Sequence, residues 1–295
     1  MKMLSGMFAA IPTPFCRDNT INTDSLKAIC EDIVSSGMQG ILVCGSTGEY
    51  SLMTADERKV AVKTVVDAVN GRTKVIAGCS CHYQADTIAM VQAAEELGAD
   101  MALILPPYYM QTTEDGIYQY YKAICESIQK IGIVIYNYPF ATGVELSVEL
   151  IKKLSTLPHM AGVKNTTEME HTSKLIGAMK DNDTFGVING FEHLVMGTLT
   201  SGGDGTMGII HALAPNQMMT IYNAVQAGDL KTAMEMNDRM RTLYTLMEQE
   251  PCPGPVKAAL TMKGMEFGVP RRPLLPASEE IKASLKDEME KINLI

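Results

Sequence analysis

Lys164 is the residue of this sequence whose type and position best suit chemistry on a carbonyl compound. It closes the apolar run Ala161–Lys164, so its side chain is expected to be partly removed from water. Burial disfavours the ammonium form, and a neutral amine can attack a ketone to form a Schiff base. The alternative is a lysine that simply extends from a strand end into solvent.

Tyr136 ends the preceding apolar run, Ile131–Tyr136, and is expected to lie within reach of Lys164. Forming and breaking an imine requires repeated proton transfers, which a phenol in a site of low dielectric constant can carry out. The alternative is a core tyrosine whose hydroxyl is already hydrogen-bonded. Together the two residues predict a catalyst in which the protonated imine is the electron sink for C–C bond cleavage.

A tight turn, Gly45–Glu49, follows another apolar run and precedes a predicted helix. Its backbone N–H groups would bind a small carboxylate, and the hydroxyls of Ser46 and Thr47 could donate to that carboxylate or bond to Tyr136. An ordinary strand-to-helix turn is the alternative. Cys44 could be a nucleophile there, although a buried thiol is the commoner case.

Eight short apolar runs separated by helical patterns must position these residues. Continuous apolar runs are typical of parallel strands covered on both faces. The predicted strands are Met7–Ile11, Gly40–Val43, Lys74–Gly78, Met101–Leu105, Ile131–Tyr136, Ala161–Lys164, Phe185–Ile188 and Gly205–Ile210. Eight strand–helix units predict an α/β protein with a closed (β/α)8 TIM barrel, in which catalytic side chains sit at the carboxyl ends of the strands. An open, doubly wound sheet is the structural alternative.

Helix signals accompany these strands and continue after the last one. Thr54 with Glu57, and Thr167 with Glu170, have the spacing of capping boxes, and Ser147 is a candidate N-cap. Further helices are predicted at Asn216–Ala227, Asp229–Met247, Val256–Lys263 and Ser278–Asn293. We therefore expect a catalytic barrel over residues 1–227 and a C-terminal helical region over residues 228–295.

Composition excludes several classes of protein. The 295 residues include 25 Lys plus Arg and 34 Asp plus Glu, a net charge of −9, which opposes binding to nucleic acid. No apolar stretch approaches the ~18 residues of a membrane span, and no signal peptide is recognised. Seven scattered cysteines favour a reducing, cytoplasmic location. The five histidines lack the close spacings typical of metal sites.

Several motifs, taken together, resemble one family across nearly the whole chain. They are Phe-Ala-Ala-Ile-Pro-Thr-Pro-Phe, Gly-Ser-Thr-Gly-Glu, Tyr-Asn-x-Pro, Gly-Val-Lys, Pro-Val-Lys-Ala-Ala-Leu and Arg-Arg-Pro-Leu-Leu-Pro. In this order they are similar to the dihydrodipicolinate synthase / N-acetylneuraminate lyase family of pyruvate-dependent class I aldolases. The resemblance implies a barrel with C-terminal helices, a homotetramer built as a dimer of dimers, and Schiff-base chemistry without a metal or organic cofactor.

The resemblance also implies roles for individual residues. Lys164 matches the imine-forming lysine and Tyr136 the proton shuttle. Ser46 and Thr47 match the residues that bind the pyruvate carboxylate, largely through backbone amides. Tyr109 matches the tyrosine that, in the synthase branch, reaches the site of a neighbouring subunit.

The substrate end departs from the better-known branches. Ala141 stands where the synthase branch has an arginine for the carboxylate of aspartate semialdehyde, which argues against lysine biosynthesis. The segment Tyr-Asn-Tyr-Pro-Phe-Ala-Thr-Gly looks most like that of 2-keto-3-deoxy sugar-acid aldolases, and the match to the sialic-acid lyases is partial. The residues expected to face the variable end of the substrate are Thr166, Gly190, Glu192, His193 and Ile209.

The sequence thus predicts a lyase that reversibly cleaves a 2-oxo-3-deoxy acid, of sugar-acid or sialic-acid type, into pyruvate and an aldehyde. A dehydratase or hydratase-aldolase working through the same imine is the nearest alternative. 4-Hydroxy-tetrahydrodipicolinate synthase is a further one, disfavoured by Ala141. A barrel that binds a keto acid without catalysis is the alternative from another class.

Overall fold

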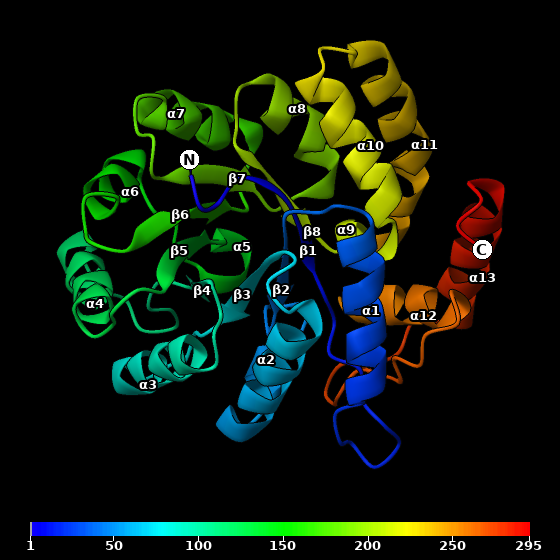
Figure 1. Ribbon diagram of the computed structural model, residues 1–295, viewed down its shortest axis with the longest axis horizontal. Coiled ribbons are helices and arrows are strands. Elements are labelled where there is room, and N and C mark those ends of the chain that lie inside the picture. Colours follow the sequence, from blue (N-terminus) through cyan, green and yellow to red (C-terminus); the bar gives the residue numbers. More distant parts are fainter. Residues whose placement is uncertain (1) are drawn as a thin grey trace. The chain divides into compact units, whose positions relative to one another are not determined.

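Eight parallel strands form the centre of the protein in the computed structural model, which describes residues 2–295. They follow one another in chain order, β1 to β8, around a closed barrel (Figure 1). The strands are β1 (Gly6–Ala10), β2 (Gly40–Val43), β3 (Lys74–Gly78), β4 (Met101–Ile104), β5 (Gly132–Asn137), β6 (Met160–Asn165), β7 (Gly186–Asn189) and β8 (Gly205–Gly208). The predicted (β/α)8 barrel is confirmed, and the doubly wound alternative is wrong.

Helices follow the strands, and several more follow β8. The helices are α1 (Thr23–Ser35), α2 (Ala55–Val69), α3 (Gln84–Glu96), α4 (Glu114–Glu126), α5 (Pro139–Thr142), α6 (Val148–Leu154), α7 (Met169–Met179), α8 (Val195–Thr200), α9 (Ile210–Leu213), α10 (Pro215–Gln226), α11 (Leu230–Glu248), α12 (Gly254–Met262) and α13 (Glu279–Lys291), with the short 3-10 helices η1 (Tyr50–Leu52) and η2 (Glu192–Leu194). None of the helices within residues 2–295 combines the length and apolarity that crossing a membrane requires.

The sequence signals for helix starts were right in two places and wrong in one. Thr54 and Glu57 form the full capping box of α2, and Ser147 caps α6 by accepting from the N–H of Leu150. The box predicted at Thr167 does not form, because α7 begins at Met169 and its N-cap is the next residue after Thr167. The Thr167 hydroxyl instead accepts a hydrogen bond from a strand-end asparagine.

The predicted eighth strand was too long. β8 ends at Gly208, Ile209 is the N-cap of α9, and that helix begins at Ile210. Buried helix and buried strand share the same apolar composition over such short stretches, so the boundary was not visible in the pattern. The other strand boundaries differ from the prediction by one residue at most at each end.

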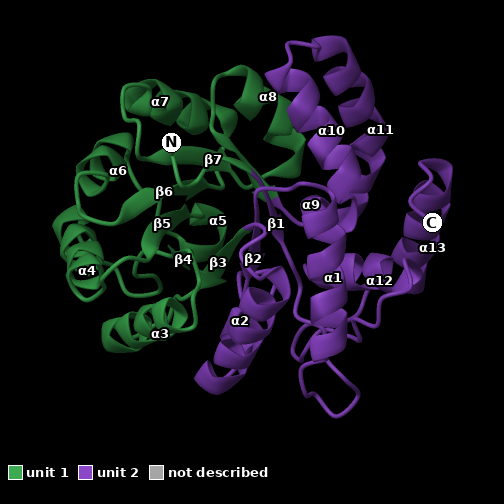
Figure 2. Ribbon diagram, viewed as in Figure 1, with its two compact units in different colours: residues 1–6, 74–207 green, residues 7–73, 208–295 purple. Residues whose placement is uncertain are grey.

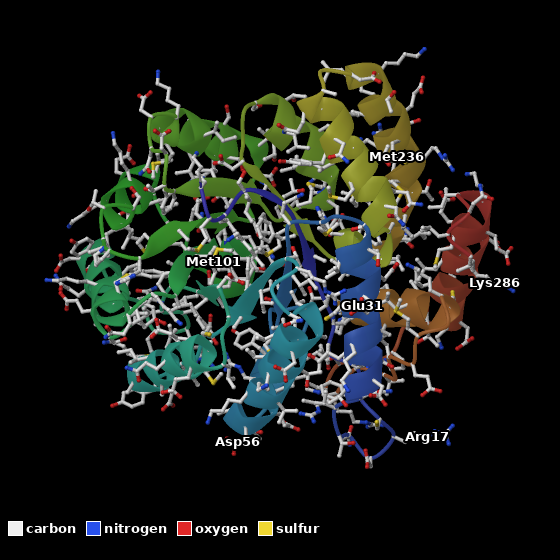
Figure 3. All side chains as sticks on the ribbon, viewed as in Figure 1. Arg17, Glu31, Asp56, Met101, Met236 and Lys286 are labelled. Atoms are coloured by element: carbon white, nitrogen blue, oxygen red, sulfur yellow. The ribbon has the colours of Figure 1, made fainter. Side chains whose placement is uncertain are left out.

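The chain divides into two compact units (Figure 2). The first comprises residues 1–6 and 74–207, and the second comprises residues 7–73 and 208–295. Each unit has a buried apolar interior and a charged exterior. Met101 on β4 is fully buried, whereas Asp56 on α2 and Lys286 on α13 are exposed and point outward from their helices (Figure 3). The boundary expected at residue 227 stays a prediction.

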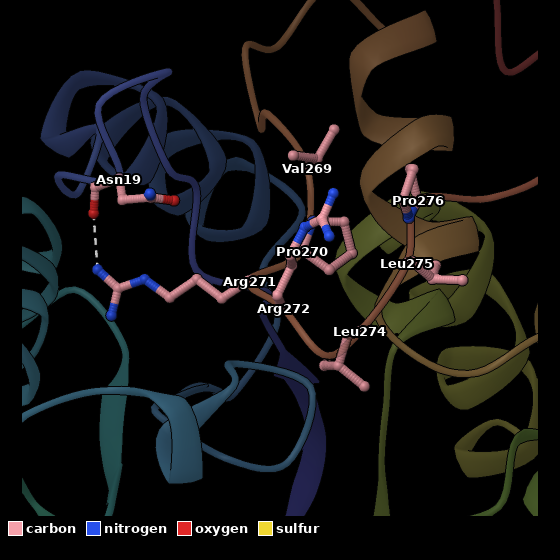
Figure 4. Close-up of a pocket in the computed structure, with 8 residues that line it drawn as sticks. All are labelled: Asn19, Val269, Pro270, Arg271, Arg272, Leu274, Leu275 and Pro276. Carbon is pink, nitrogen blue, oxygen red and sulfur yellow. Dashed lines mark hydrogen bonds between the residues drawn. The ribbon is translucent and has the colours of Figure 1, made fainter.

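Arg271 ties together separate segments of the second unit. Its guanidinium donates to the backbone oxygens of Leu52 at 2.9 Å and Asn19 at 2.6 Å, and it forms a two-pronged ion pair with Glu57. The Arg271 side chain extends toward Asn19, and both residues line a hollow of about 600 Å³ together with Arg272 and apolar side chains (Figure 4). The Arg271 guanidinium therefore serves to hold these segments of the second unit together.

The Arg271–Glu57 pair should make stability depend on acid. Hydrogen bonds from Arg271 hold the pKa of Glu57 at about 2, below its ordinary 4.5. Because the folded-state pKa is the lower one, the contribution is complete above pH 4.5 and is lost as pH falls toward 2. Solvent screening reduces the effect of this pair, whose side chains are 14% and 30% exposed, to about 1 kcal/mol. We expect Glu57→Gln to lower the melting temperature by about 2–4 °C at pH 7, and by progressively less from pH 4.5 to pH 3. Calorimetry across this range tests it, and a constant difference contradicts it.

Candidate active site

Lys164 and Tyr136 lie side by side on neighbouring strands. The register of β5 and β6 pairs Tyr136 with Lys164, so both side chains leave the sheet on the same face and at the same level. The Nζ atom of Lys164 is 4.5 Å from the centroid of the Tyr136 ring. Lys164 is 6% exposed and Tyr136 is 5% exposed. The structure thus brings together, away from bulk water, the amine and the phenol that the sequence singled out.

One aromatic ring stacks on this pair, and three others form a separate group in the first unit. The ring of Tyr138 stacks on that of Tyr136, with centroids 5.5 Å apart and planes inclined by 13°. Phe140 on α5 meets Phe191, which follows β7, edge to face at 5.9 Å, and His193 stacks on Phe191 at 5.2 Å. Stacking restrains the plane of the Tyr136 ring, which carries the phenol oxygen.

Gly190 has no side chain, and the side chains of Lys164 and Thr166 occupy the space that one would need. A Cβ atom at position 190 would lie 2.0 Å from the Thr166 hydroxyl oxygen and 2.8 Å from Cε of Lys164, which no real side chain tolerates. The Thr166 hydroxyl is buried and has no hydrogen-bond partner within residues 2–295. A buried polar atom without a partner costs about 1–3 kcal/mol, so a ligand that bonds to it gains affinity. Three of the predicted site residues therefore adjoin one another.

The remaining predicted residues of the first unit differ in their surroundings. Glu192, in η2, is buried at 8% exposure, whereas its neighbour His193 is exposed. Tyr109 is 89% exposed and has a left-handed backbone with φ of +73°. A large aromatic side chain so fully in water is available to a partner molecule, and nothing in its surroundings links it to Lys164.

The predicted carboxylate-binding turn lies in the second unit. Thr47 is buried and Ser46 is exposed, and the N–H groups of both donate to no atom of the described chain. The turn closes through a 3.0 Å hydrogen bond from the N–H of Glu49 to the carbonyl of Ser46. Cys44 precedes it, and burial raises the pKa of that thiol to about 12, so it is not a thiolate nucleophile near neutral pH. Ile209, also in this unit, is half-buried at the start of α9.

A buried ion pair that the sequence analysis missed supports this turn. Glu49 and Lys257 are 0% and 1% exposed and are 2.5 Å apart. Glu49 also accepts the backbone N–H of Arg271 at 2.7 Å, while Lys257 donates to the carbonyl of Val269 at 3.2 Å. Lys257 stands in the Pro-Val-Lys-Ala-Ala-Leu motif and Glu49 in Gly-Ser-Thr-Gly-Glu, but nothing in either motif indicates that the two meet.

Glu49 and Lys257 stabilise each other's charged form in the buried interior. Burial lowers the pKa of Lys257, and the charge of Glu49 opposes that change. Each group therefore supplies the charge that the other needs in a place without water.

As for metal binding, no group of three or more histidine, cysteine, aspartate or glutamate side chains within residues 2–295 is arranged to hold an ion.

Comparison with known proteins agrees with this geometry. The model of the dihydrodipicolinate synthetase family matches residues 3–292. A protein named 4-hydroxy-tetrahydrodipicolinate synthase from Anaeromyxobacter sp. (strain K) is 34% identical over 100% of this chain and 99% of its own length.

Solved structures show the same likeness. A dihydrodipicolinate synthase from Thermotoga maritima has a TM-score of 0.95 at 30% identity and covers 99% of this chain and 100% of its own. YagE of E. coli K12, a prophage protein of the same family solved with pyruvate, has a TM-score of 0.93 at 26% identity, with 99% of both chains covered. The expected resemblance is confirmed: the chain belongs to the dihydrodipicolinate synthetase family and is a class I pyruvate-dependent aldolase.

Proposed function

We propose that the protein reversibly cleaves a 2-oxo-3-deoxy acid into pyruvate and an aldehyde through an imine on Lys164. The observation that carries this proposal is the buried Lys164 amine held 4.5 Å from the ring of Tyr136. An amine that is 6% exposed loses much of the hydration that favours its charged form, which makes it a better nucleophile at neutral pH.

The reaction begins when Nζ of Lys164 attacks the C2 ketone and water leaves, forming the imine. Tyr136 gives its phenolic proton to the imine nitrogen and, as the phenolate, then accepts the proton of the C4 hydroxyl. The C3–C4 bond breaks, and the aldehyde departs. The electron pair of that bond moves into the protonated imine and gives an enamine, which takes up at C3 the proton that Tyr136 now carries. Water then releases pyruvate and restores the free amine. The chain supplies every group of this sequence except the water.

The remaining predicted residues hold the two ends of the substrate. The Ser46–Thr47 turn binds the carboxylate through its N–H groups, which suit an anion. The hydroxyl of Thr166, the space at Gly190 and the buried carboxylate of Glu192 suit the hydroxyl-bearing end. The family resemblance assigns His193 and Ile209 to the same end of the substrate.

The aldehyde partner is the finer part of the proposal. Ala141 lies on α5, is exposed and offers no charge to a second carboxylate. This supports a hydroxylated aldehyde without an acidic side chain. The second candidate is 4-hydroxy-tetrahydrodipicolinate synthase, which joins pyruvate to aspartate semialdehyde. It is favoured by the names of the relatives at 34% identity.

The test uses pyruvate, sodium borohydride and a panel of aldehydes. Reduction with pyruvate should attach one reduced adduct to the peptide that contains Lys164, as peptide mass spectrometry detects. Glyceraldehyde should then form a new C–C bond with pyruvate faster than aspartate semialdehyde does. The reverse order establishes the synthase, and conversion of a 2-oxo-3-deoxy acid with loss of water but no aldehyde establishes a dehydratase. No adduct at any pyruvate concentration leaves a barrel that binds without catalysis.

Assembly and location form part of the same proposal. We propose a cytoplasmic homotetramer in which the exposed ring of Tyr109 reaches a neighbouring subunit. One structural relative, with a TM-score of 0.95, is described as a monomeric variant of dihydrodipicolinate synthase, so the subunit count needs its own measurement. Light scattering of the purified protein supplies it, and a monomer that retains full activity contradicts the role of Tyr109.

Tyr136→Phe should separate proton transfer from imine formation. The variant keeps the stacked ring but lacks the hydroxyl, so substrate still fits while the C4 proton has no acceptor. General acid–base catalysis contributes about 10²-fold or more, and we expect kcat for cleavage to fall by about 10²-fold. Steady-state kinetics measure this, with KM within about threefold of the wild type because the ring is retained. Unchanged kcat would assign the proton transfer to another group.

A further inference from the structure

Three asparagines stand at the same level of neighbouring strands. The registers of β5 with β6 and of β6 with β7 pair Asn137 with Asn165 and Asn165 with Asn189. All three are 0% exposed. Each of the first two directly follows a reactive residue, Tyr136 or Lys164. Since side chains alternate along a strand, the asparagines lie on the face of the sheet opposite to the amine and the phenol.

Backbone groups at both ends fix the direction of the amides. The N–H of Leu146 donates to Oδ1 of Asn137 at 3.1 Å, and the N–H of Phe191 donates to Oδ1 of Asn189 at 2.7 Å. A backbone N–H can only donate, so neither amide can turn over. Nδ2 of Asn137 therefore donates to Oδ1 of Asn165, at 2.8 Å. The orientation of the Asn165 amide follows from this.

Nδ2 of Asn165 consequently faces three acceptors. They are the hydroxyl of Thr167 at 2.7 Å, the hydroxyl of Thr172 at 3.0 Å and Nδ1 of His171 at 3.2 Å. The carbonyl of Leu146 can only accept, so Nε2 of His171 carries a proton and donates to it at 2.9 Å, while Nδ1 faces the Asn165 amide. The chain of bonds thus starts and ends on Leu146 and closes on itself.

Thr172 on α7 links the hydrogen bonds of Asn189 to those of Asn165. Its hydroxyl accepts from Nδ2 of Asn165 and, at 2.8 Å, from Nδ2 of Asn189, and it donates to the carbonyl of Glu168 at 3.2 Å. Thr172 is 0% exposed. The closed set of bonds therefore connects the ends of β5, β6 and β7 to one helix, which holds these strand ends in a single arrangement.

We propose that Asn165 and Thr172 are positioning residues for the imine-forming pair. They touch no substrate, because they lie behind the sheet, but they hold the strand ends from which Lys164 and Tyr136 project. A misplacement of about 1 Å can slow a reaction by about 10²-fold, so a loosened strand end affects rate before it affects fold. The inference rests on the proposed imine chemistry of Lys164.

The test compares Thr172→Val with Thr172→Ser. Valine keeps the shape of threonine but removes the hydroxyl, whereas serine keeps the hydroxyl and removes the methyl group. Borohydride quenching at successive times gives the rate constant of pyruvate imine formation on Lys164 and the pyruvate concentration at half saturation. Asn165→Leu, which breaks the chain of bonds at its centre, is measured alongside. Asn182→Ala is the control, because the side chain of Asn182 bonds only to Thr184 and Phe185 in the turn before β7.

We expect Thr172→Val to slow imine formation about 3- to 10-fold and Asn165→Leu to slow it at least about 10-fold, with half-saturation changed less than twofold. Thr172→Ser and Asn182→Ala should react at the wild-type rate. A wild-type rate in Thr172→Val, or equal slowing by valine and serine, overturns the proposal. If Asn165→Leu does not fold, the threonine pair decides alone. If the wild type forms no adduct, the proposed function fails first, and this inference fails with it.

Discussion

A protein with methionine in place of Lys164 is expected to form no pyruvate imine and to lose turnover by at least about 10³-fold. Methionine has a similar length and no amine, so covalent attack on the ketone is impossible while the space beside Gly190 stays filled. The fold should survive, because the substitution exchanges a buried amine for an apolar side chain of similar shape in a site that is 6% exposed. Borohydride trapping and steady-state kinetics provide the two readouts.

Lys152→Met is the matched control for that experiment. Lys152 lies in the last turn of α6, in the same unit, and is exposed. It should leave turnover and the adduct unchanged. Residual turnover above one tenth of the wild type in Lys164→Met, with circular dichroism showing a folded protein, would move the nucleophile to another residue.

The second large effect concerns stability. Lys257→Met should destabilise the protein by about 3–5 kcal/mol, because it leaves the carboxylate of Glu49 buried without a counter-charge. Glu49 retains the N–H of Arg271 as its remaining described hydrogen-bond partner, which does not neutralise it. Urea unfolding followed by circular dichroism measures the change as a shift of the midpoint at constant slope.

The double variant Glu49→Gln with Lys257→Met supplies the sharper comparison. Glutamine still accepts the N–H of Arg271, and no net charge remains buried, so most of the lost stability should return. Lys59→Met is the comparison at the surface, where the side chains of Lys59 and its partner Asp56 are 46% and 92% exposed. Loss of that ion pair should cost less than about 1 kcal/mol of stability. If the double variant is no more stable than Lys257→Met, the loss comes from packing, and the electrostatic explanation is wrong.

The barrel could be predicted because its signals are local. Each strand is a short apolar run, and Thr54 with Glu57 forms a capping box whose members are three residues apart. The end of β8 could not be predicted, because the apolar residues beyond Gly208 suit a buried helix as well as a strand. At Thr167 the predicted cap competed with a buried asparagine, and the hydroxyl accepts from that side chain instead of starting the helix.

The site was predictable to the same extent. Lys164 and Tyr136 stand out because both close apolar strands, and strand register then determines that they meet. The pairing of Glu49 with Lys257 was not predictable, since nothing local marks a glutamate in a turn and a lysine in a distant helix as partners. The directed amides of Asn165 and its neighbours are likewise a property of tertiary structure, because their orientation depends on which backbone groups face them.

The pairing of Glu49 with Lys257 and Arg271, which are far apart in the sequence, has a consequence for biosynthesis. Glu49 and Arg271 are 222 residues apart, and ribosomes add about 5–20 residues per second. The Glu49 carboxylate therefore leaves the ribosome roughly 10–45 s before the lysine and arginine that stabilise it. Until then Glu49 lacks its buried counter-charge, so the nascent second unit cannot complete this part of its interior. A message truncated shortly before codon 257 would yield a chain that quality control should recognise and degrade.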